Sequence, residues 1–245
     1  MSRLPAQDGK PSRQRRIAMS TRWDVSAVLL DMDGTLLDTE KVYFESLVAA
    51  LHSCGYTDDV IPLCHAMVGL PGPECEAMLL DRYGETFPIA SINRAFAANR
   101  DELFRSGLPL KHGAVTLLDA LAAAGCPMAI VTSSTRHGAE THLTLAGIRS
   151  RFDTILTRDD VTRSKPSPDL YLLAAERLGV RPQTCVAVED SNHGVTAAHA
   201  AGAITIMVPD VVPPTEASLT RCAAVVSDLH AVVEILGARG GLVRR

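Results

Sequence analysis

Two aspartates, Asp31 and Asp33, stand one residue apart where an apolar run ends. The run before them, residues 25–30, is rich in strand-forming residues, and Gly34 and Thr35 after them favour a turn. Side chains alternate along a strand, so both carboxylates can lie on the same side. Neighbouring carboxylates repel each other and are costly to remove from water, so the pair predicts a bound cation or a reaction. The simpler alternative is a solvated junction between a strand, a turn and a helix.

Further polar groups follow other apolar, strand-like runs. Three hydroxyl residues, a lysine in a proline-rich loop and two acids make up this set: Thr132, Ser133, Ser134, Lys165, Glu189 and Asp190. Strand-like runs alternate with helical patterns from residue 110 onward, which predicts a parallel sheet. Because the carboxyl ends of parallel strands meet at one edge, we expect all of these groups to gather there.

The charges of this group call for a counterion. Four carboxylates are offset by Lys165 alone, and they belong to Asp31, Asp33, Glu189 and Asp190. At an effective dielectric constant of about 20, two like charges about 4 Å apart repel by roughly 4 kcal/mol. Oxygen ligands without a cysteine nearby select a hard ion, so the four acids predict a Mg²⁺ site rather than a zinc site. His193 lies a helical step beyond the acids, and we expect it to be a surface or packing residue.

The same groups are suited to binding a phosphoryl group. The turn at Gly34 and Thr35 can present backbone N–H groups, because glycine allows close approach. The hydroxyl and N–H groups of residues 132–134 can donate to phosphate oxygens, since they precede a helix. Lys165 can hold a phosphate oxygen and a nucleophile together, and Pro166 favours an extended backbone that fixes its direction. The alternative for Lys165 is an ordinary solvated loop lysine.

The elements that must position these groups form an α/β pattern. Strands are predicted at residues 25–30, 127–131, 152–156, 184–188 and 203–208, and helices at 113–124, 136–146, 168–178, 192–201 and 228–236. This alternation is typical of a Rossmann-like parallel sheet with helices on both faces. The core is expected to comprise residues 23–39 and 108–237.

Residues 40–107 have a different pattern. Helical spacing occurs at 41–51, 73–82 and 91–104, with no strand-like run between these segments. The pattern predicts an all-helical cap domain, inserted over the edge of the sheet where α/β proteins bind ligands. The alternative is an insertion that only thickens the fold.

The composition limits the function classes. The chain has 245 residues, a formal net charge of −4 and a pI of about 6.1, which gives no general attraction to nucleic acid or anionic lipid. No apolar run approaches about 18 residues, so no membrane span is expected. The six cysteines form no Cys-x-x-Cys pair, which favours free thiols in a reducing cytoplasm. The sequence leaves open whether the protein is a monomer or a homodimer.

The two ends are expected to lie outside the folded core. Residues 1–22 are basic, with Asp8 as their sole acid, and they lack the apolar core of a secretory signal. Such a segment is expected to be disordered, although Met19 offers an alternative start and an organelle transit peptide is a further alternative. Residues 238–245 are expected to form a flexible tail.

Four motifs, in this order, resemble those of the haloacid dehalogenase (HAD) superfamily, and within it the phosphatases and β-phosphoglucomutase-like proteins. The motifs are Asp31-Met-Asp-Gly-Thr-Leu-Leu-Asp-Thr39, Ile130-Val-Thr-Ser133, Lys165-Pro-Ser-Pro168, and Val188-Glu-Asp-Ser191 with Gly194. The resemblance extends from residue 25 to about 236. It implies a HAD-like core with a helical cap between the first and second motifs.

The resemblance also implies a role for each motif. Asp31 would be the nucleophile that forms an aspartyl-phosphate, and Asp33 the acid that protonates the leaving group and then the base that activates water. Asp31, Asp190 and the main-chain carbonyl of Asp33 would hold Mg²⁺, with Glu189 helping directly or through water. The transferring phosphoryl group would be bound by Thr132, Ser133 and Lys165.

Departures from the family patterns narrow the expected activity. Dehalogenases lack the second aspartate, so Asp33 argues against dehalogenation. Phosphomutases carry a cap arginine that binds a second phosphate, whereas residues 67–74 of this chain hold no basic residue. Phosphonoacetaldehyde hydrolases carry a cap lysine, whereas residues 42–110 hold no lysine. A phosphoric monoester hydrolase is therefore expected. The alternatives are a sugar phosphomutase, a phospho-accepting signalling receiver, which lacks such an insertion, and a binding-only pseudo-enzyme.

The cap is expected to contact the leaving group. The candidate contacts are Glu40, Tyr43, Gly69 and Leu70, and the alternative for the glycine- and proline-rich loop is a simple helix end. Without a basic residue in this loop, an uncharged polar leaving group fits best. The expected reaction is the Mg²⁺-dependent hydrolysis of a small phosphate monoester, either a sugar phosphate or a nucleotide-like compound.

Overall fold

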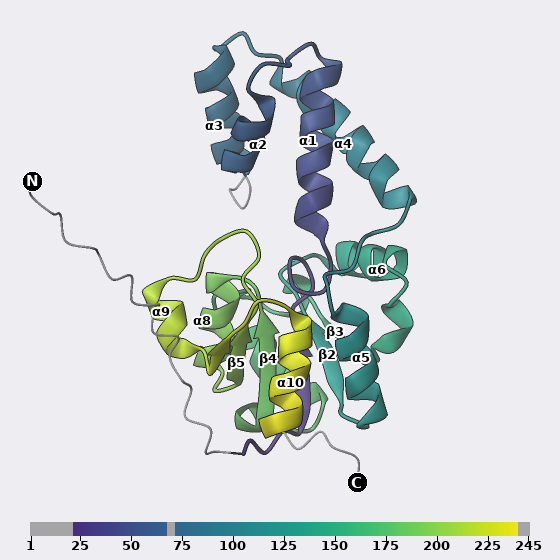
Figure 1. The fold of residues 1–245 in the computed structure, drawn as a ribbon, viewed down its shortest axis with the longest axis vertical. Coiled ribbons are helices and arrows are strands. Elements are labelled where there is room, and N and C mark those ends of the chain that lie inside the picture. Colours follow the sequence, from purple (N-terminus) through teal and green to yellow (C-terminus); the bar gives the residue numbers. More distant parts are fainter. Residues whose placement is uncertain (1–21, 68–71, 240–245) are drawn as a thin grey trace, which may run out of the picture.

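The computed structural model describes residues 22–67 and 72–239. In these residues a parallel sheet of six strands has the order β3-β2-β1-β4-β5-β6 (Figure 1). The strands are β1 (Ala27–Leu30), β2 (Met128–Val131), β3 (Thr154–Leu156), β4 (Cys185–Glu189), β5 (Ile204–Met207) and β6 (Ala224–Val225). All neighbouring pairs are parallel, so every carboxyl end lies at the same edge of the sheet.

The two faces of the sheet are covered by different helices. In β1, Val28 and Leu30 pack into one apolar cluster, whereas Ala27 and Leu29 pack into the other. The first cluster is closed by α5 (Ala114–Ala123), α6 (Arg136–Leu145) and α10 (Leu229–Arg239), and the second by α7 (Asp169–Arg177) and α8 (Asn192–Ala200). β1 and β4 are buried along their whole length, which explains why their sequences are apolar without alternation as far as Glu189, the last residue of β4.

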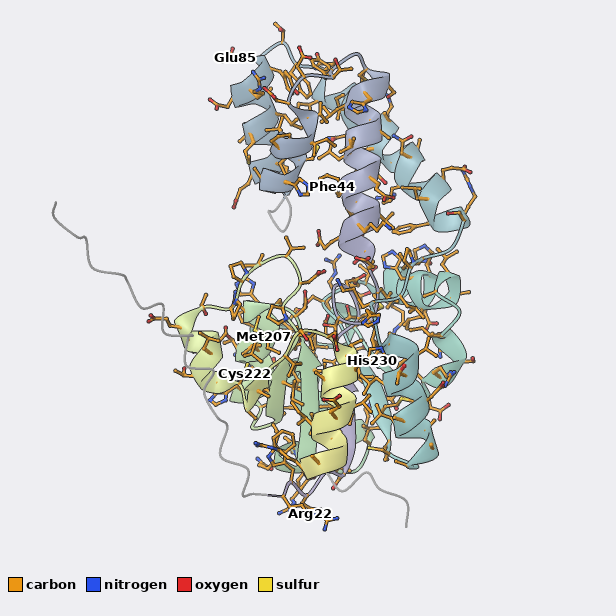
Figure 2. All side chains as sticks on the ribbon, in the orientation of Figure 1. Arg22, Phe44, Glu85, Met207, Cys222 and His230 are labelled. Atoms are coloured by element: carbon orange, nitrogen blue, oxygen red, sulfur yellow. The ribbon has the colours of Figure 1, made fainter. Side chains whose placement is uncertain are left out.

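Four helices follow β1 and form a separate layer at the carboxyl edge of the sheet (Figure 1). They are α1 (Thr39–Ser53), α2 (Val60–Met67), α3 (Gly72–Tyr83) and α4 (Ile89–Arg105). These helices have an apolar core of their own, in which Leu51, Leu79 and Ile92 are buried. Phe44, labelled in Figure 2, packs against this core. We call residues 39–105 the cap.

The predicted α/β class and the helical insertion are both observed. The predicted strands and helices all occur, with their ends displaced by a few residues. The sequence missed α2, α9 (Glu216–Arg221) and β6, together with three 3₁₀ turns at Arg149–Arg151, Arg158–Asp160 and Pro182–Thr184. These elements are too short to show a clear periodicity, and Pro62 lies within the first turn of α2.

The expected terminal segments fall largely outside the described residues. Residues 1–21, 68–71 and 240–245 lie outside the described residues, and so does the segment expected to be disordered, except for Arg22. α10 continues to Arg239, two residues beyond the expected end of the core. In the part of the chain that the structure describes, no helix is long and apolar enough to cross a membrane.

Candidate active site

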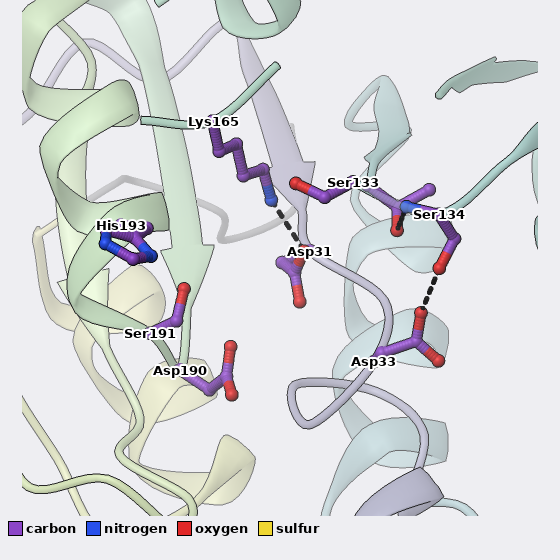
Figure 3. A pocket seen from close by; sticks show the side chains of 9 residues that line it. Asp31, Asp33, Ser133, Ser134, Lys165, Asp190, Ser191 and His193 are labelled. Atoms are coloured by element: carbon purple, nitrogen blue, oxygen red, sulfur yellow. Dashed lines mark hydrogen bonds and ion pairs between the residues drawn. The ribbon is translucent and has the colours of Figure 1, made fainter. Parts of the chain in front are cut away.

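The carboxyl ends of β1, β2 and β4 bring the four motifs together. β1 lies between β2 and β4, and the N–H of Asp31 donates to the carbonyl of Val188 at 3.0 Å. A pocket of about 440 Å³ lies at this edge (Figure 3). Its lining residues are Asp31, Asp33, Thr132, Ser133, Ser134, Lys165, Asp190, Ser191 and His193. Residues from all four motifs therefore surround one pocket.

Lys165 is buried at the base of this pocket and pairs with two acids. Its Nζ lies 2.6 Å from Oδ1 of Asp31, 2.5 Å from Oε1 of Glu189 and 2.7 Å from the carbonyl oxygen of Val131. The three acceptors match the three donors of an ammonium group. Burial alone would lower the pKa of Lys165, but the charges of Asp31 and Glu189 outweigh it and raise the pKa. The solvated-loop alternative for Lys165 is wrong, because its side chain is 4% exposed.

Glu189 lies behind the pocket rather than on its surface. Its side chain is fully buried, and its Oε1 also accepts a 2.5 Å hydrogen bond from the Tyr171 hydroxyl. Ser191 donates to the other carboxylate oxygen at 3.3 Å. The space is so tight that a Cβ on Gly194 would lie 1.9 Å from the Glu189 carboxyl carbon, which explains the glycine of the fourth motif.

Three carboxylates form the candidate metal site. One oxygen from each of Asp31, Glu189 and Asp190 lies within 4.8 Å of the others. Burial raises the pKa of Asp31 to about 7, against the opposing charge of Lys165. Burial and the charges of Asp31 and Glu189 raise the pKa of Asp190 to about 9. The positive charge of the protein is thus too small to balance the negative charge of these acids. Their all-oxygen donor set fits a hard divalent cation.

The turn after β1 supports Asp190 from the side. Gly34 has φ of +81°, and a Cβ there would lie 2.4 Å from Oδ2 of Asp190, so only glycine fits. The Thr35 hydroxyl lies 3.4 Å from Oδ1 of Asp190 and donates to it. Both residues were predicted to bind phosphate, and neither lines the pocket.

The Asp33 carboxylate is held by the opposite wall. The hydroxyl of Ser134 donates to Oδ2 at 2.7 Å, and Nδ1 of His142 lies 3.3 Å from Oδ1. Ser134 was predicted to bind phosphate, and here its hydroxyl donates to Asp33 instead. Its N–H donates to the Thr132 hydroxyl at 3.0 Å. Ser133 is exposed in the pocket lining.

The cap residues predicted to touch the leaving group lie next to the pocket but do not line it. Glu40 and Tyr43 occupy the first turns of α1. Burial and the charges of nearby acids, Asp33 among them, raise the pKa of both side chains. Gly69 and Leu70 lie outside the described residues.

The two chain segments that join the cap to the core run side by side. The N–H of Asp38 donates to the carbonyl of Pro109, and the N–H of Lys111 donates to the carbonyl of Leu36, both at 2.9 Å. The Lys111 ammonium lies 2.6 Å from the Asp210 carboxylate and 3.7 Å from that of Asp38. We call these paired segments the hinge.

Sequence reasoning missed several residues of this site. Tyr171 lies on α7 and His142 on α6. The sequence offered one sign of His142, which is a polar residue next to the buried apolar residue Leu143. His193 was expected at the surface or in packing, and it is exposed while also lining the pocket. Asp210 and Lys111 are 99 positions apart and carry no motif.

The comparisons with known proteins agree with this geometry. The family model described as haloacid dehalogenase-like hydrolase matches residues 28–208, a range that contains all four motifs. The chain therefore belongs to the haloacid dehalogenase-like hydrolase family.

Two curated relatives are named as phosphatases of sugar phosphates. One is a phosphorylated carbohydrates phosphatase of Thermotoga maritima, 32% identical over 180 residues, covering 73% of this chain and 82% of the relative. The other is the fructose-1-phosphate phosphatase YqaB of Escherichia coli, 34% identical over 183 residues, covering 72% and 93%. Such relatives support the expected class of phosphoric monoester hydrolase.

Two solved structures share the whole architecture. A HAD family hydrolase from Deinococcus radiodurans, with bound phosphate and sodium, has a TM-score of 0.78 and 30% identity, covering 91% of this chain and 99% of that one. A putative β-phosphoglucomutase from Thermotoga maritima has a TM-score of 0.75 and 29% identity, covering 87% and 99%. The predicted family, fold class and hydrolase class are thereby confirmed.

Proposed function

We propose that this protein is a Mg²⁺-dependent phosphatase that hydrolyses a small phosphate monoester through an aspartyl-phosphate on Asp31. One observation carries the proposal: Asp31 stands at the carboxyl end of β1 with Oδ1 bound to Lys165, in a pocket also lined by Asp190 and Thr132. Its Oδ2 accepts no hydrogen bond within the described residues, so it is available to attack phosphorus.

The chain's own residues account for each half of the reaction. Asp31 Oδ2 forms a bond to phosphorus as the bond from phosphorus to the ester oxygen breaks, and Asp33 gives its proton to that oxygen. Asp33 then takes a proton from water, whose oxygen attacks phosphorus as the bond from phosphorus to Asp31 Oδ2 breaks. Inorganic phosphate is released, and Asp31 is again a carboxylate. The hydroxyl of Thr132 and the N–H of Ser133 would orient the phosphoryl oxygens.

Mg²⁺ would be held by Asp31, Asp190 and the main-chain carbonyl of Asp33, and it would neutralise charge on the phosphoryl group. Glu189 would contribute to the site directly or through water. Its buried contacts with Lys165 and Tyr171 also support a role in holding Lys165 against Asp31.

The substrate class follows from the cap and from the relatives. The cap residues 67–74 contain no lysine or arginine, which favours an uncharged polar leaving group over a second phosphate. Relatives named for phosphorylated carbohydrates and fructose 1-phosphate point the same way. We therefore propose a sugar phosphate as substrate, with a nucleotide-like monoester as the alternative, hydrolysed in the cytoplasm by a monomer or homodimer.

A sugar phosphomutase is the second candidate. Its support is the likeness to a putative β-phosphoglucomutase over 87% of this chain. The absence of lysine and arginine at positions 67–74 speaks against it, because a bisphosphate intermediate needs a second phosphate contact.

A substrate screen decides between these activities. Purified protein with excess Mg²⁺ is offered a panel of sugar phosphates, nucleoside monophosphates and p-nitrophenyl phosphate, and both inorganic phosphate and isomerised sugar phosphate are measured. We expect phosphate release that is lost in Asp31→Asn and retained in the control Asp24→Asn, which alters an exposed aspartate before β1. Isomerisation without phosphate release would favour the mutase, and inactivity on every ester would refute both.

A further inference from the structure

Both oxygens of the Asp33 carboxylate lie within hydrogen-bond distance of side chains that can donate or accept a hydrogen bond. Oδ2 is 2.7 Å from the Ser134 hydroxyl, and Oδ1 is 3.3 Å from Nδ1 of His142. A hydroxyl or an imidazole nitrogen can donate to an ionised carboxylate and can accept from a protonated one. A lysine or arginine in either place would favour the ionised form only. The partners of Asp33 are therefore suited to a group that must hold and release a proton.

His142 reaches Asp33 from outside the pocket. It lies on α6, its side chain is 12% exposed, and it is not among the residues that line the pocket. Figure 3 shows the Asp33 carboxylate turned toward Ser134, on the side of the pocket away from Lys165 and Asp190. The rotation of this carboxylate is thus fixed by Ser134 and by His142 of α6, on one side of the pocket.

The imidazole of His142 is in turn packed against the cap. Its ring centroid lies 4.9 Å from that of Phe104, a buried residue in the last turn of α4. Phe104 also makes an edge-on contact with Tyr43 of α1, with centroids 6.3 Å apart. The two cap helices that adjoin the hinge therefore meet at Phe104, and Phe104 meets His142.

We infer that His142 is a positioning residue for Asp33, and that Phe104 makes this positioning depend on where the cap stands. The inference rests on the proposed function, in which Asp33 gives a proton to the leaving oxygen. A carboxylate held through one oxygen by Ser134 rotates about its terminal torsion, whereas a second contact at Oδ1 fixes it. Misplacement of a catalytic group by about 1 Å costs up to about 100-fold in rate.

The first test compares esters that differ in their need for that proton. p-Nitrophenolate leaves without protonation, whereas a sugar alkoxide does not. His142→Leu is therefore expected to lower kcat/KM for the best sugar phosphate of the screen by about tenfold. It should leave kcat/KM for p-nitrophenyl phosphate and the Mg²⁺ concentration dependence within about twofold of wild type. An equal loss on both esters would show a merely structural role and overturn the inference.

Three further variants complete the test. His142→Asn keeps a polar nitrogen near the position of Nδ1 and is expected to recover most of the lost rate. Phe104→Leu keeps an apolar residue but removes the ring, and it should give a smaller loss that does not add to that of His142→Leu. His137→Ala, at an exposed position of the same helix, is the matched control and should behave as wild type. Failure of His142→Asn to recover activity would count against the inference.

A double-mutant cycle and a spectrum separate this inference from the proposed function. In an Asp33→Asn background, His142→Leu should cause no further loss of activity, and an undiminished loss there would overturn the inference. Independently of turnover, Asp33→Asn should shift the ¹⁵N resonance of His142 Nδ1 in the metal-free protein. An unchanged resonance would refute the contact itself. If the resonance shifts in Asp33→Asn but the wild-type protein cleaves no ester, the contact stands and the proposed function is refuted.

Discussion

Nζ of Lys165 lies 2.6 Å from Oδ1 of Asp31, although the two residues are 134 positions apart in the chain. The contact leaves one carboxylate oxygen of Asp31 for the pocket and fixes the direction of that oxygen. If Asp31 is the nucleophile, as we propose, it would enter the reaction with little loss of conformational freedom.

Replacing the nucleophile should abolish turnover without unfolding the protein. Asp31→Asn removes the attacking oxygen but keeps the size of the side chain. We expect release of phosphate from p-nitrophenyl phosphate to fall by about 1,000-fold or more, with the melting temperature close to that of Asp24→Asn. Activity within about tenfold of wild type would remove Asp31 from the role of nucleophile.

Asp33→Asn should slow both half-reactions and spare the metal. The amide neither donates a proton to the leaving oxygen nor accepts one from water, so each step should slow by about 100-fold for a sugar phosphate. Rapid-quench measurement of the phosphorylated protein follows the two steps separately. Because only the main-chain carbonyl of Asp33 is assigned to Mg²⁺, the dissociation constant of the ion should stay within about threefold. A large loss of Mg²⁺ affinity would show that its carboxylate binds the ion.

Tyr171→Phe should weaken the buried cluster beneath the pocket. The variant removes the 2.5 Å hydrogen bond to Glu189, which then retains Lys165 and Ser191 as donors. A hydrogen bond to a charged group contributes about 1.5–3 kcal/mol, so the melting temperature should fall by several degrees. The control is Tyr56→Phe, since the Tyr56 hydroxyl makes no hydrogen bond within the described residues. Equal melting temperatures for the two variants would contradict this account.

Metal-free protein should lose stability as the pH rises from about 5 to about 8. The folded chain keeps protons on Asp31, with a pKa of about 7, and on Asp190, with a pKa of about 9. The unfolded chain has released them, because the ordinary pKa of an aspartate is 3.8. The folded state thus binds more protons in this range, and raising the pH favours unfolding.

Mg²⁺ should reverse this trend, because the ion competes with the protons on the two acids. At a concentration of about 100 times its dissociation constant, the ion stabilises the folded state by about 2.7 kcal/mol. Thermal melts with Mg²⁺ or EDTA at the two pH values should show a larger rise at the higher pH. Asp190→Asn should remove most of that difference. Equal rises at both pH values would contradict the assignment of these acids.

The sequence predicted the meeting of Asp31 and Asp190 because both follow apolar strands of one parallel sheet. It also predicted the cap, since residues 40–107 lack any strand-like run. It did not reveal that β1 lies between β2 and β4, because strand order depends on crossover connections rather than local pattern. The sequence did not predict the roles of His142 and Tyr171 for another reason. Packing between elements decides which face of a helix meets a carboxylate.

The hinge has a consequence for how this fold can vary. Hydrogen bonds from Asp38 to Pro109 and from Lys111 to Leu36 hold the start and the end of the insertion together. A segment whose ends already touch can be exchanged for one of another size without stretching the strands beneath it. A chain built on this plan can therefore exchange the layer above its pocket by replacing one contiguous stretch of sequence, while Asp31 stays where it is at the end of β1.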